Sequence, residues 1–441
     1  MYALRGGFLV RPLIIAVLLG AVGATLSSLE ENIPAIADWL PETLFPSHQD
    51  PQMAQVILGG IAGSIMTVVS IVFAILLMTL TLASTQFSPR ILVNFVRDRT
   101  TQWTLGLFLG TFSYCIAALP AARTLPHPFA PVATVAGAMV LALLCVAWLI
   151  FFINHISQSV SVNHIIDRIA RETELVIDDL MPLKRTPLHQ QEQPPVPEIE
   201  GEVVIVNETS GYVRFVETQK LLQLARTHGI RVRMLRRVGH FIPAGIPLLL
   251  VSRPDRLSHD LIYELRGAVD IGPTRTLQQD VEFGVIQIVD IALRAISPAI
   301  NDPSTAISCI DQLSRILIRW IGRASPPSRI HNPPHVLRVV LPWIDLNGIL
   351  DTAFEQIRHY SASDVAVSLR LLRALGDIAS TVREPQLREM LRRRAQSVIE
   401  GCQGRLPDSD LVMLRERAAA AFVALSTTDQ TWNWPAMRDA D

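Results

Sequence analysis

The densest group of polar side chains that could do chemistry lies in the stretch Gly272–Ala306, GPTRTLQQDVEFGVIQIVDIALRAISPAINDPSTA. Its candidate ligand residues are Asp280, Glu282, Asp290, Arg294, Asn301 and Asp302. If these side chains converged, their oxygens would suit Mg²⁺ or Ca²⁺, which prefer carboxylate and carbonyl ligands. The alternative is structural, because a capped corner between two helices accounts for most of the same residues. The stretch is therefore a candidate ligand site or a structural corner.

Two predicted helices would position these residues. An amphipathic pattern predicts the first helix over residues 276–296, where Asp290 and Arg294 are spaced i,i+4 and can form an ion pair. Ser297-Pro298 ends this helix. Asp302-Pro303 then supplies an N-cap and a proline at the first position of a second helix over residues 303–321.

Catalytic and metal-binding motifs are missing from the sequence. GxSxG, HExxH and HxH do not occur, and Ser297 precedes a proline with no histidine nearby. His331 and His335 flank two prolines, which favours a loop over a helical metal site. The cysteines form no CxxC pair. We predict that the protein is not an enzyme and that it carries no metal and no cofactor.

The overall composition indicates a membrane protein. Of 441 residues, 49% are hydrophobic and 18% are charged, whereas soluble proteins average about 25% charged residues. The mean hydropathy is +0.33. The 39 basic and 40 acidic side chains nearly balance, which excludes a basic nucleic-acid-binding protein as a class.

Four uncharged apolar stretches are long enough to cross a bilayer. They are Pro12–Leu29, Val56–Ala83, Thr104–Leu119 and Val132–Ile153. Arg5 and Arg11 precede the first stretch, and Arg90, Arg97 and Arg99 follow the second, so the positive-inside rule predicts that both termini are cytoplasmic. The first stretch also partly fits a cleaved signal peptide, but its length favours retention. Since no span contains Asp, Glu, Lys, Arg or His, an ion-coupled pump has no candidate carrier residue.

The second span carries the most informative pattern. Small and hydroxyl side chains recur on one helix face, at steps that alternate between four and three residues. The members of this stripe are Gly60, Ser64, Thr67, Thr81 and Thr85. One interpretation is close helix packing. The other is the lining of a pore in an oligomer, with Arg90, Arg97 and Arg99 at its cytoplasmic mouth.

The sequence divides into five segments. We predict a transmembrane domain over 1–154, a juxtamembrane helix with a proline-rich linker over 155–199, a small β-rich module over 200–255, a helical region over 256–426 and a disordered tail over 427–441. In the helical region, capping and breaking residues predict helices over 345–360, 364–382, 385–402 and 408–425. The fold class is an α-helical membrane protein with four transmembrane helices and an α+β cytoplasmic domain. That domain begins with a small β-barrel or sandwich-like module.

Two long stretches resemble a known protein family. They are Thr81–Phe112 and Asp290–Leu313, and the likeness continues through Ser210–Val213 and Phe241–Leu248. The sequence is similar to the predicted bacterial membrane protein family known as domain of unknown function 2254. The resemblance implies a multi-pass protein of the bacterial inner (plasma) membrane with a cytoplasmic domain. It implies no activity and no site residues.

Two functional hypotheses follow from the sequence. The first is an oligomeric conduit for an ion or small solute, regulated by the cytoplasmic domain. The second is a membrane-anchored sensor or scaffold whose cytoplasmic domain binds a ligand or a protein partner. The expected partners are the lipid bilayer and further copies of the same chain, with no nucleic acid.

Overall fold

The computed structural model describes residues 10–33, 50–86, 99–125, 128–159, 161–183, 202–332 and 336–423. Side chains are not described for residues 82–86, 158–159 and 423. The chain divides into an N-terminal unit, Met1–His164, and a C-terminal unit, Ile165–Asp441. Most of the predicted linker, the predicted tail and the predicted mouth residues Arg90 and Arg97 lie outside the described residues.

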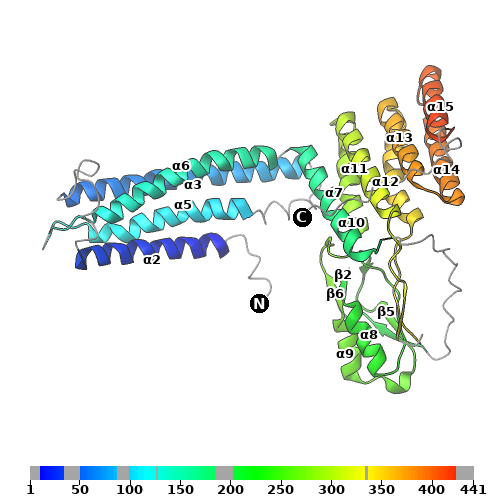
Figure 1. Ribbon diagram of the computed structural model, residues 1–441, viewed down its shortest axis with the longest axis horizontal. Coiled ribbons are helices and arrows are strands. Elements are labelled where there is room, and N and C mark those ends of the chain that lie inside the picture. The colour runs from blue at the N-terminus through cyan, green and yellow to red at the C-terminus, as the bar shows by residue number, and fades with distance from the viewer. Residues whose placement is uncertain are drawn as a thin grey trace. The chain divides into compact units, whose positions relative to one another are not determined.

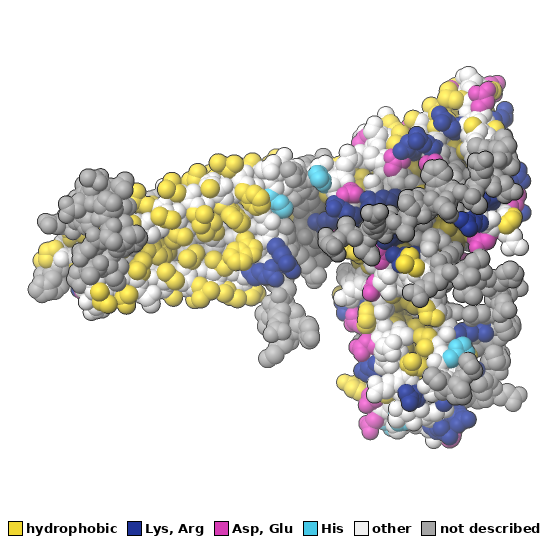
Figure 2. Space-filling model, viewed as in Figure 1, with side chains coloured by type: hydrophobic (Ala, Val, Ile, Leu, Met, Phe, Trp, Pro, Cys, Tyr) yellow, Lys and Arg dark blue, Asp and Glu magenta, His cyan; other side chains and the backbone are white. Residues whose placement is uncertain are grey.

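The described part of the N-terminal unit is built of long helices that run side by side (Figure 1). They are α2 (Val10–Asn32), α3 (Pro51–Gln86), α5 (Arg99–Ala118) and α6 (Val132–Ser159), with the short 3-10 helix η3 (Leu119–Ala121) after α5. All four long helices have the length and composition to cross a membrane, which confirms the four predicted spans. Figure 2 shows hydrophobic side chains over most of the described face of this unit.

Small residues allow α2 and α5 to approach closely. A Cβ at Gly106 of α5 would come within 2.6 Å of Ile15 Cδ1, and a Cβ at Gly23 of α2 would come within 2.6 Å of the Tyr114 carbonyl oxygen. Close backbone approach at small residues is the usual way in which transmembrane helices pack. These glycines therefore allow helices of the same chain to pack against each other.

An acidic residue joins the ends of two of these helices. The Glu30 carboxylate, on a residue only 2% exposed, accepts hydrogen bonds from the Ala133 amide (2.8 Å) and from the Thr134 amide (3.1 Å) and hydroxyl (3.0 Å). It therefore caps the N-terminus of α6, where unpaired amides and the helix dipole favour a negative charge. Glu30 lies in the last turn of α2, directly after the predicted apolar stretch Pro12–Leu29.

The C-terminal unit contains two open sheets. The strands are β1 (Val203–Val206), β2 (Gly211–Val216), β3 (Val232–Met234), β4 (Phe241–Ile242), β5 (Pro247–Val251), β6 (Val269–Gly272), β7 (Arg329–Asn332) and β8 (Val336–Val340). Their orders are β1-β5-β3-β8-β7 and β4-β2-β6. The prediction of a closed barrel is wrong, because β1 and β7 remain as edges of the larger sheet. The predicted loop at His331 is also corrected, since His331 belongs to β7.

The two sheets share one core with α8 (Thr218–Thr227) and α9 (His259–Gly267), while the 3-10 helix η4 (Pro254–Arg256) precedes α9. Val213 of β2, Leu249 of β5 and Leu221 of α8 are fully buried in this core. Val232 of β3 pairs in parallel with Val339 of β8. β8 therefore belongs to the same sheet as β1, which begins at residue 203. Residues 336–340 were predicted to lie in a helical region, and the structure corrects this prediction.

The remaining helices form the rest of the C-terminal unit. They are α7 (Val162–Leu180), α10 (Val281–Ala295), α11 (Pro303–Ile321), α12 (Leu346–Tyr360), α13 (Val365–Thr381), α14 (Pro385–Cys402) and α15 (Asp408–Val423). Asp302, Asp345 and Asp364 accept capping hydrogen bonds from backbone amides at the starts of α11, α12 and α13, as their sequence positions predict. The predicted juxtamembrane helix is not one element, because α6 continues to Ser159 and α7 begins at Val162.

Candidate functional site

A buried cluster of opposite charges lies where the sheets meet the helices. We call it the ion-pair cluster; it consists of Arg237, Arg275, Asp280 and Glu282. Arg237 follows β3 and donates two hydrogen bonds of 2.9 Å to Glu282. Arg275 donates to Asp280 at 2.7 and 2.8 Å and to Glu282 at 2.9 Å. Two guanidinium groups thus balance two carboxylates in fork-like pairs, the strongest geometry for such bonds.

Local sequence explains how the cluster is held. Asp280 is the N-cap of α10 and accepts a hydrogen bond from the Phe283 amide at 3.0 Å, so α10 begins at Val281 and not near residue 276 as predicted. Gly239 has φ +90°, and a Cβ there would come within 2.5 Å of both Arg275 Nη2 and Asp280 Oδ2. Only glycine fits this close approach. The α10 start and the turn after β3 therefore build the cluster together.

The cluster sets the ionisation of its members. Burial by itself would raise the pKa of Glu282, but hydrogen bonds and charge from Arg237 and Arg275 outweigh burial and hold that pKa below its usual range. Burial opposes the charge of Arg275 as well, yet Asp280 and Glu282 raise its pKa. Burial and the nearby Arg237 lower the pKa of His240. The carboxylate of Glu282 is therefore ionised at neutral pH, and His240 favours the uncharged form.

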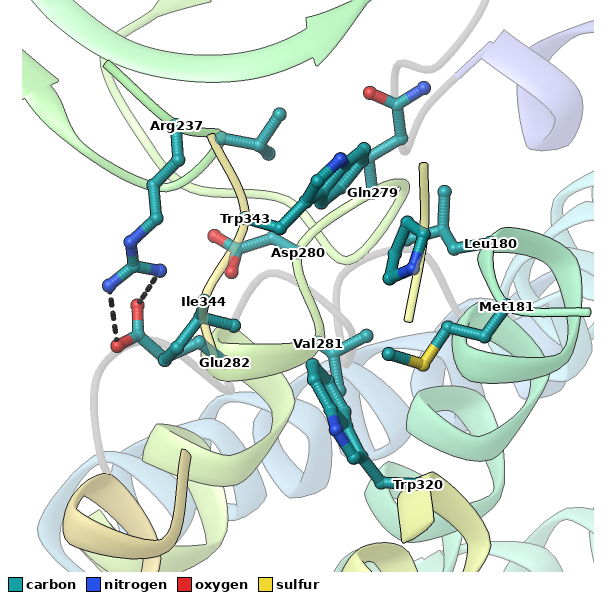
Figure 3. A pocket seen from close by; sticks show the side chains of 12 residues that line it. Leu180, Met181, Arg237, Gln279, Asp280, Val281, Glu282, Trp320, Trp343 and Ile344 are labelled. Carbon is teal, nitrogen blue, oxygen red and sulfur yellow. Dashed lines mark hydrogen bonds and ion pairs between the residues drawn. The ribbon is translucent and has the colours of Figure 1, made fainter. Parts of the chain in front are cut away.

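A small cavity adjoins the ion-pair cluster (Figure 3). Its volume is about 30 Å³, which is room for about one water molecule. Trp320 of α11 and Trp343, before α12, contribute indole rings, and Met181 lies at the end of α7. The cavity is too small for a metabolite, so its residues form a junction between the sheets, α7, α10 and α11.

The structure does not gather all six predicted ligand residues in one place. Asp280 and Glu282 share the ion-pair cluster at the start of α10, whereas Asn301 and Asp302 follow its C-terminal end. A helix of 15 residues rises about 22 Å between those ends. Asp290 and Arg294 lie on the helix between them. Within the described residues, no group of three or more His, Cys, Asp or Glu is placed to hold a metal ion.

Sequence reasoning missed the two arginines of the cluster. Arg237 lies 45 residues from Glu282 along the chain, so no local spacing connects them. Arg275 is only 5 residues from Asp280 and lies inside the stretch Gly272–Ala306. The available signal was the pair Asp280 and Glu282, which lie just before and within the first turn of a buried helix. Buried carboxylates need charged partners, so this pair indicated that basic side chains lie nearby.

A second set of ion pairs fastens α7 to α11. We call it the arginine ladder; its members are Arg315 and Arg319 of α11, Arg323 just after the end of α11, and Asp167, Glu174 and Asp178 of α7. Arg315 contacts both Asp167 and Glu174 at 2.9 Å. Arg319 donates to Asp178 at 2.8 Å and holds its pKa below the usual range against burial. Because Arg315 and Arg319 are four residues apart, they lie on one face of α11.

Glycine at residue 284 brings α10 against α7. A Cβ at Gly284 would overlap the Thr173 hydroxyl group. Thr173 is fully buried and donates to the Ile169 carbonyl. The helix that follows the fourth span is thus packed into the C-terminal unit on two sides, by α10 and by α11.

A wider surface groove of about 600 Å³ lies between α14 and α15. Arg392, Arg393 and Arg415 line its polar side, and Phe422 is among its apolar residues. Arg392 and Arg393 both pair with Glu389 on their own helix. Their side chains are 65% and 78% exposed, as expected of a solvated helix face.

The predicted stripe on α3 faces away from the other described helices. Gly60, Ser64, Thr67 and Thr81 are all exposed. A Cβ added at Gly59, Gly60 or Gly63 would meet no described atom within 4 Å. Packing against another helix in the described part of the chain therefore does not explain the stripe. Thr85 belongs to α3 although its side chain is not described, and Arg99, at the start of α5, is exposed.

Four helices of spanning length and composition, joined to a mixed α/β unit, define a predicted membrane protein. The chain belongs to the family of predicted membrane proteins DUF2254, which it matches over residues 5–377. It is 32% identical over 408 residues to uncharacterized proteins of Mycobacterium tuberculosis and Mycobacterium bovis. The matched region covers 91% of this chain and 78% of each relative. No solved structure matches the chain.

Proposed function

We propose that the protein is an oligomeric conduit for an ion or a small solute in the bacterial inner membrane. Copies would associate through the exposed face of α3, and the C-terminal unit would lie in the cytoplasm and regulate the pathway. The observation that carries the proposal is the open glycine and hydroxyl face of α3.

The contrast with the other glycines supports association through α3. Gly23 and Gly106 are covered by neighbouring helices of the same chain, whereas Gly59 and Gly63 are not. Gly59 and Gly63 have GxxxG spacing, which allows two transmembrane backbones to meet closely. A second copy would supply the contacts that these glycines lack within one chain.

Hydroxyl groups on the same helix support a pathway along it. Thr67 donates to the Gly63 carbonyl at 3.0 Å, and Thr81 donates to the Leu77 carbonyl at 2.9 Å. Since the hydroxyl protons are used, the oxygens keep only acceptor capacity on the exposed face. Such a face suits contact with a second copy or with water in a pore, and it contains no charged carrier group.

Regulation by the C-terminal unit is supported by the arginine ladder. The chain passes from the last helix of spanning composition, which ends at Ser159, to α7, which begins at Val162. Asp167, Glu174 and Asp178 then bind α7 to α11. A movement of α7 would therefore be transmitted to the helices of the C-terminal unit. A rearrangement of those helices would likewise move α7.

Electrical recording of the purified protein in planar bilayers tests the conduit. We expect currents from the native chain and a change in unitary conductance for Thr67→Trp. Ile150→Trp on α6 is the matched control, because Ile150 is 68% exposed and lies outside the stripe. Absence of currents, or equal conductance for both variants, would refute the proposal.

The second candidate function is a membrane-anchored sensor or scaffold. It is favoured by the junction at the ion-pair cluster, where elements from the sheets, α7, α10 and α12 meet. A thermal-shift screen of the detergent-purified full chain with nucleotides, divalent metals and lipid headgroups tests it, since a ligand of the native state raises the melting temperature. A raised melting temperature together with silent bilayers would favour this function over the conduit.

A further inference from the structure

The turn between α10 and α11 forms an uncharged, exposed tip. It comprises Ser297–Asn301, of sequence SPAIN, and Pro298, Ala299, Ile300 and Asn301 are all exposed. The Ile300 side chain is 45% exposed. An exposed apolar turn is notable here because the neighbouring helices bury their apolar faces.

The backbone amides of Ile300, Asn301 and Asp302, which close the tip, are hydrogen-bonded to carbonyls of the same turn and of α10. The amides of Ile300 and Asn301 donate to the Ser297 carbonyl at 3.0 and 2.9 Å, and the Asp302 amide donates to the Ala295 carbonyl at 2.8 Å. Asn301 adopts φ +50° and closes the turn, a conformation that asparagine tolerates better than most residues. Backbone groups that are already paired can leave water at low cost. The tip is thus suited to a weakly polar environment.

Side-chain contacts place the tip level with the start of α7. Arg315 of α11 lies beside Asp167 and Glu174, and Arg319 lies beside Asp178, so α7 and α11 run in the same direction. α11 begins about three turns before Arg315. Moving back by the same distance along α7 from the residues that Arg315 contacts, Asp167 and Glu174, leads to the beginning of α7. The short turn between α10 and α11 reverses the chain direction, so the C-terminal end of α10 lies at the same level as the start of α11. The contact of Gly284, near the start of α10, with Thr173 in the middle of α7 agrees with this direction.

Chain length limits how far the start of α7 can lie from the end of the fourth predicted span. The spanning segment of α6 extends to Ser157, and α7 begins at Val162. The few residues between them reach at most about 18 Å even when fully extended. Packed helices are separated by about 8–10 Å, so the tip beside the start of α7 lies within reach of the lipid headgroups.

We propose that Pro298–Ile300 inserts into the headgroup layer of the phospholipid bilayer and anchors the C-terminal unit to the membrane surface. The inserted surface is small and uncharged, and the Ile300 amide within it is already hydrogen-bonded, which favours interfacial contact. This anchor goes beyond the conduit proposal and does not depend on it, because it holds whether or not the protein conducts.

Site-directed spin labelling of the full chain in phosphatidylethanolamine and phosphatidylglycerol vesicles tests the anchor. The native cysteines, Cys115, Cys145, Cys309 and Cys402, are all buried, so a nitroxide can be attached selectively at Ile300→Cys. We expect the label to be several-fold more accessible to oxygen, which partitions into lipid, than to a water-soluble nickel chelate. Ala299→Cys provides a second probe of the same tip.

Tyr263→Cys is the matched control, because Tyr263 of α9 is 79% exposed and lies outside the tip. We expect the nickel chelate to reach this label better than oxygen does. Aqueous accessibility at both 300 and 299 would overturn the proposal. A label that neither reagent reaches would also overturn it, because it would show that protein covers the tip. Bilayer currents are measured separately, so failure of the conduit leaves this result intact.

Discussion

At the scale of single residues, Glu282 carries the clearest stability prediction. Its carboxylate receives hydrogen bonds from both Arg237 and Arg275, and its side chain is only 11% exposed. Glu282→Gln keeps the shape but leaves two guanidinium groups facing one carboxylate. We expect a loss of about 3 kcal/mol, at the lower end of the range for breaking a buried ion pair, since Arg237 remains 20% exposed. Thermal unfolding of the purified protein measures this loss.

Glu389→Gln is the matched control for Glu282→Gln. Glu389 also binds two arginines, which lower its pKa to about 2, but it lies on the surface. We expect little change in melting temperature, because exposed ion pairs contribute little. Equal losses from both variants would contradict the importance of burial.

The same residue predicts a pH dependence. The pKa of Glu282 is lower in the folded chain than its usual value, which is about 4.3. Its stabilising contribution is therefore complete above that value and is lost as the pH falls through the lower, folded pKa. Melting curves between neutral and acidic pH should show the native chain and Glu282→Gln converging in acid. Parallel curves would contradict this assignment.

At the scale of elements, the contact between α7 and α10 depends on Gly284. A methyl group at 284 would overlap Thr173, so Gly284→Ala should destabilise the protein by about 1–3 kcal/mol through overpacking. Gly267→Ala in α9 is the control, because its nearest neighbour, Lys220 Nζ, is 3.8 Å from an added Cβ. There alanine should stabilise the helix slightly. Denaturation of both variants tests whether α7 is packed as described, and a neutral Gly284→Ala would contradict it.

Elements whose signals are local could be predicted from the sequence, and elements that depend on distant partners could not. Asp302 and Pro303 predict the start of α11 because a cap acts within one turn. The short apolar runs of β1 and β5 indicate strands but say nothing about closure, and β8 joins their sheet from residues 336–340. In the same way, Asp280 and Glu282 were identified, but Arg237 reaches Glu282 from the turn after β3. Pairing across such separations is decided by packing and leaves no local pattern.

At the scale of the whole molecule, the described glycines of the long apolar helices fall into two groups. Some pack within one chain, and others are open to contact with a second copy. Gly106 is covered by Ile15 of the same chain, whereas Gly63 meets no described neighbour. Gly106→Leu should therefore lower the melting temperature, because the added side chain overlaps α2. Gly63→Leu should leave the melting temperature of the isolated chain unchanged and reduce the mass of the detergent-solubilised assembly, since it blocks close approach of a second α3.

The two leucine variants make the test decisive because the added side chain is identical. Mass measurement and melting are made on the same samples, so a loss of mass without a loss of stability identifies α3 as the contact between copies. Cysteine cross-linking at Gly60, against Leu13→Cys as a lipid-exposed control at 64% exposure, gives an independent measure in native membranes. If Gly63→Leu retains the native mass, or if the native chain is a monomer, the face of α3 meets lipid. A pathway through an assembly would then have no basis in this helix.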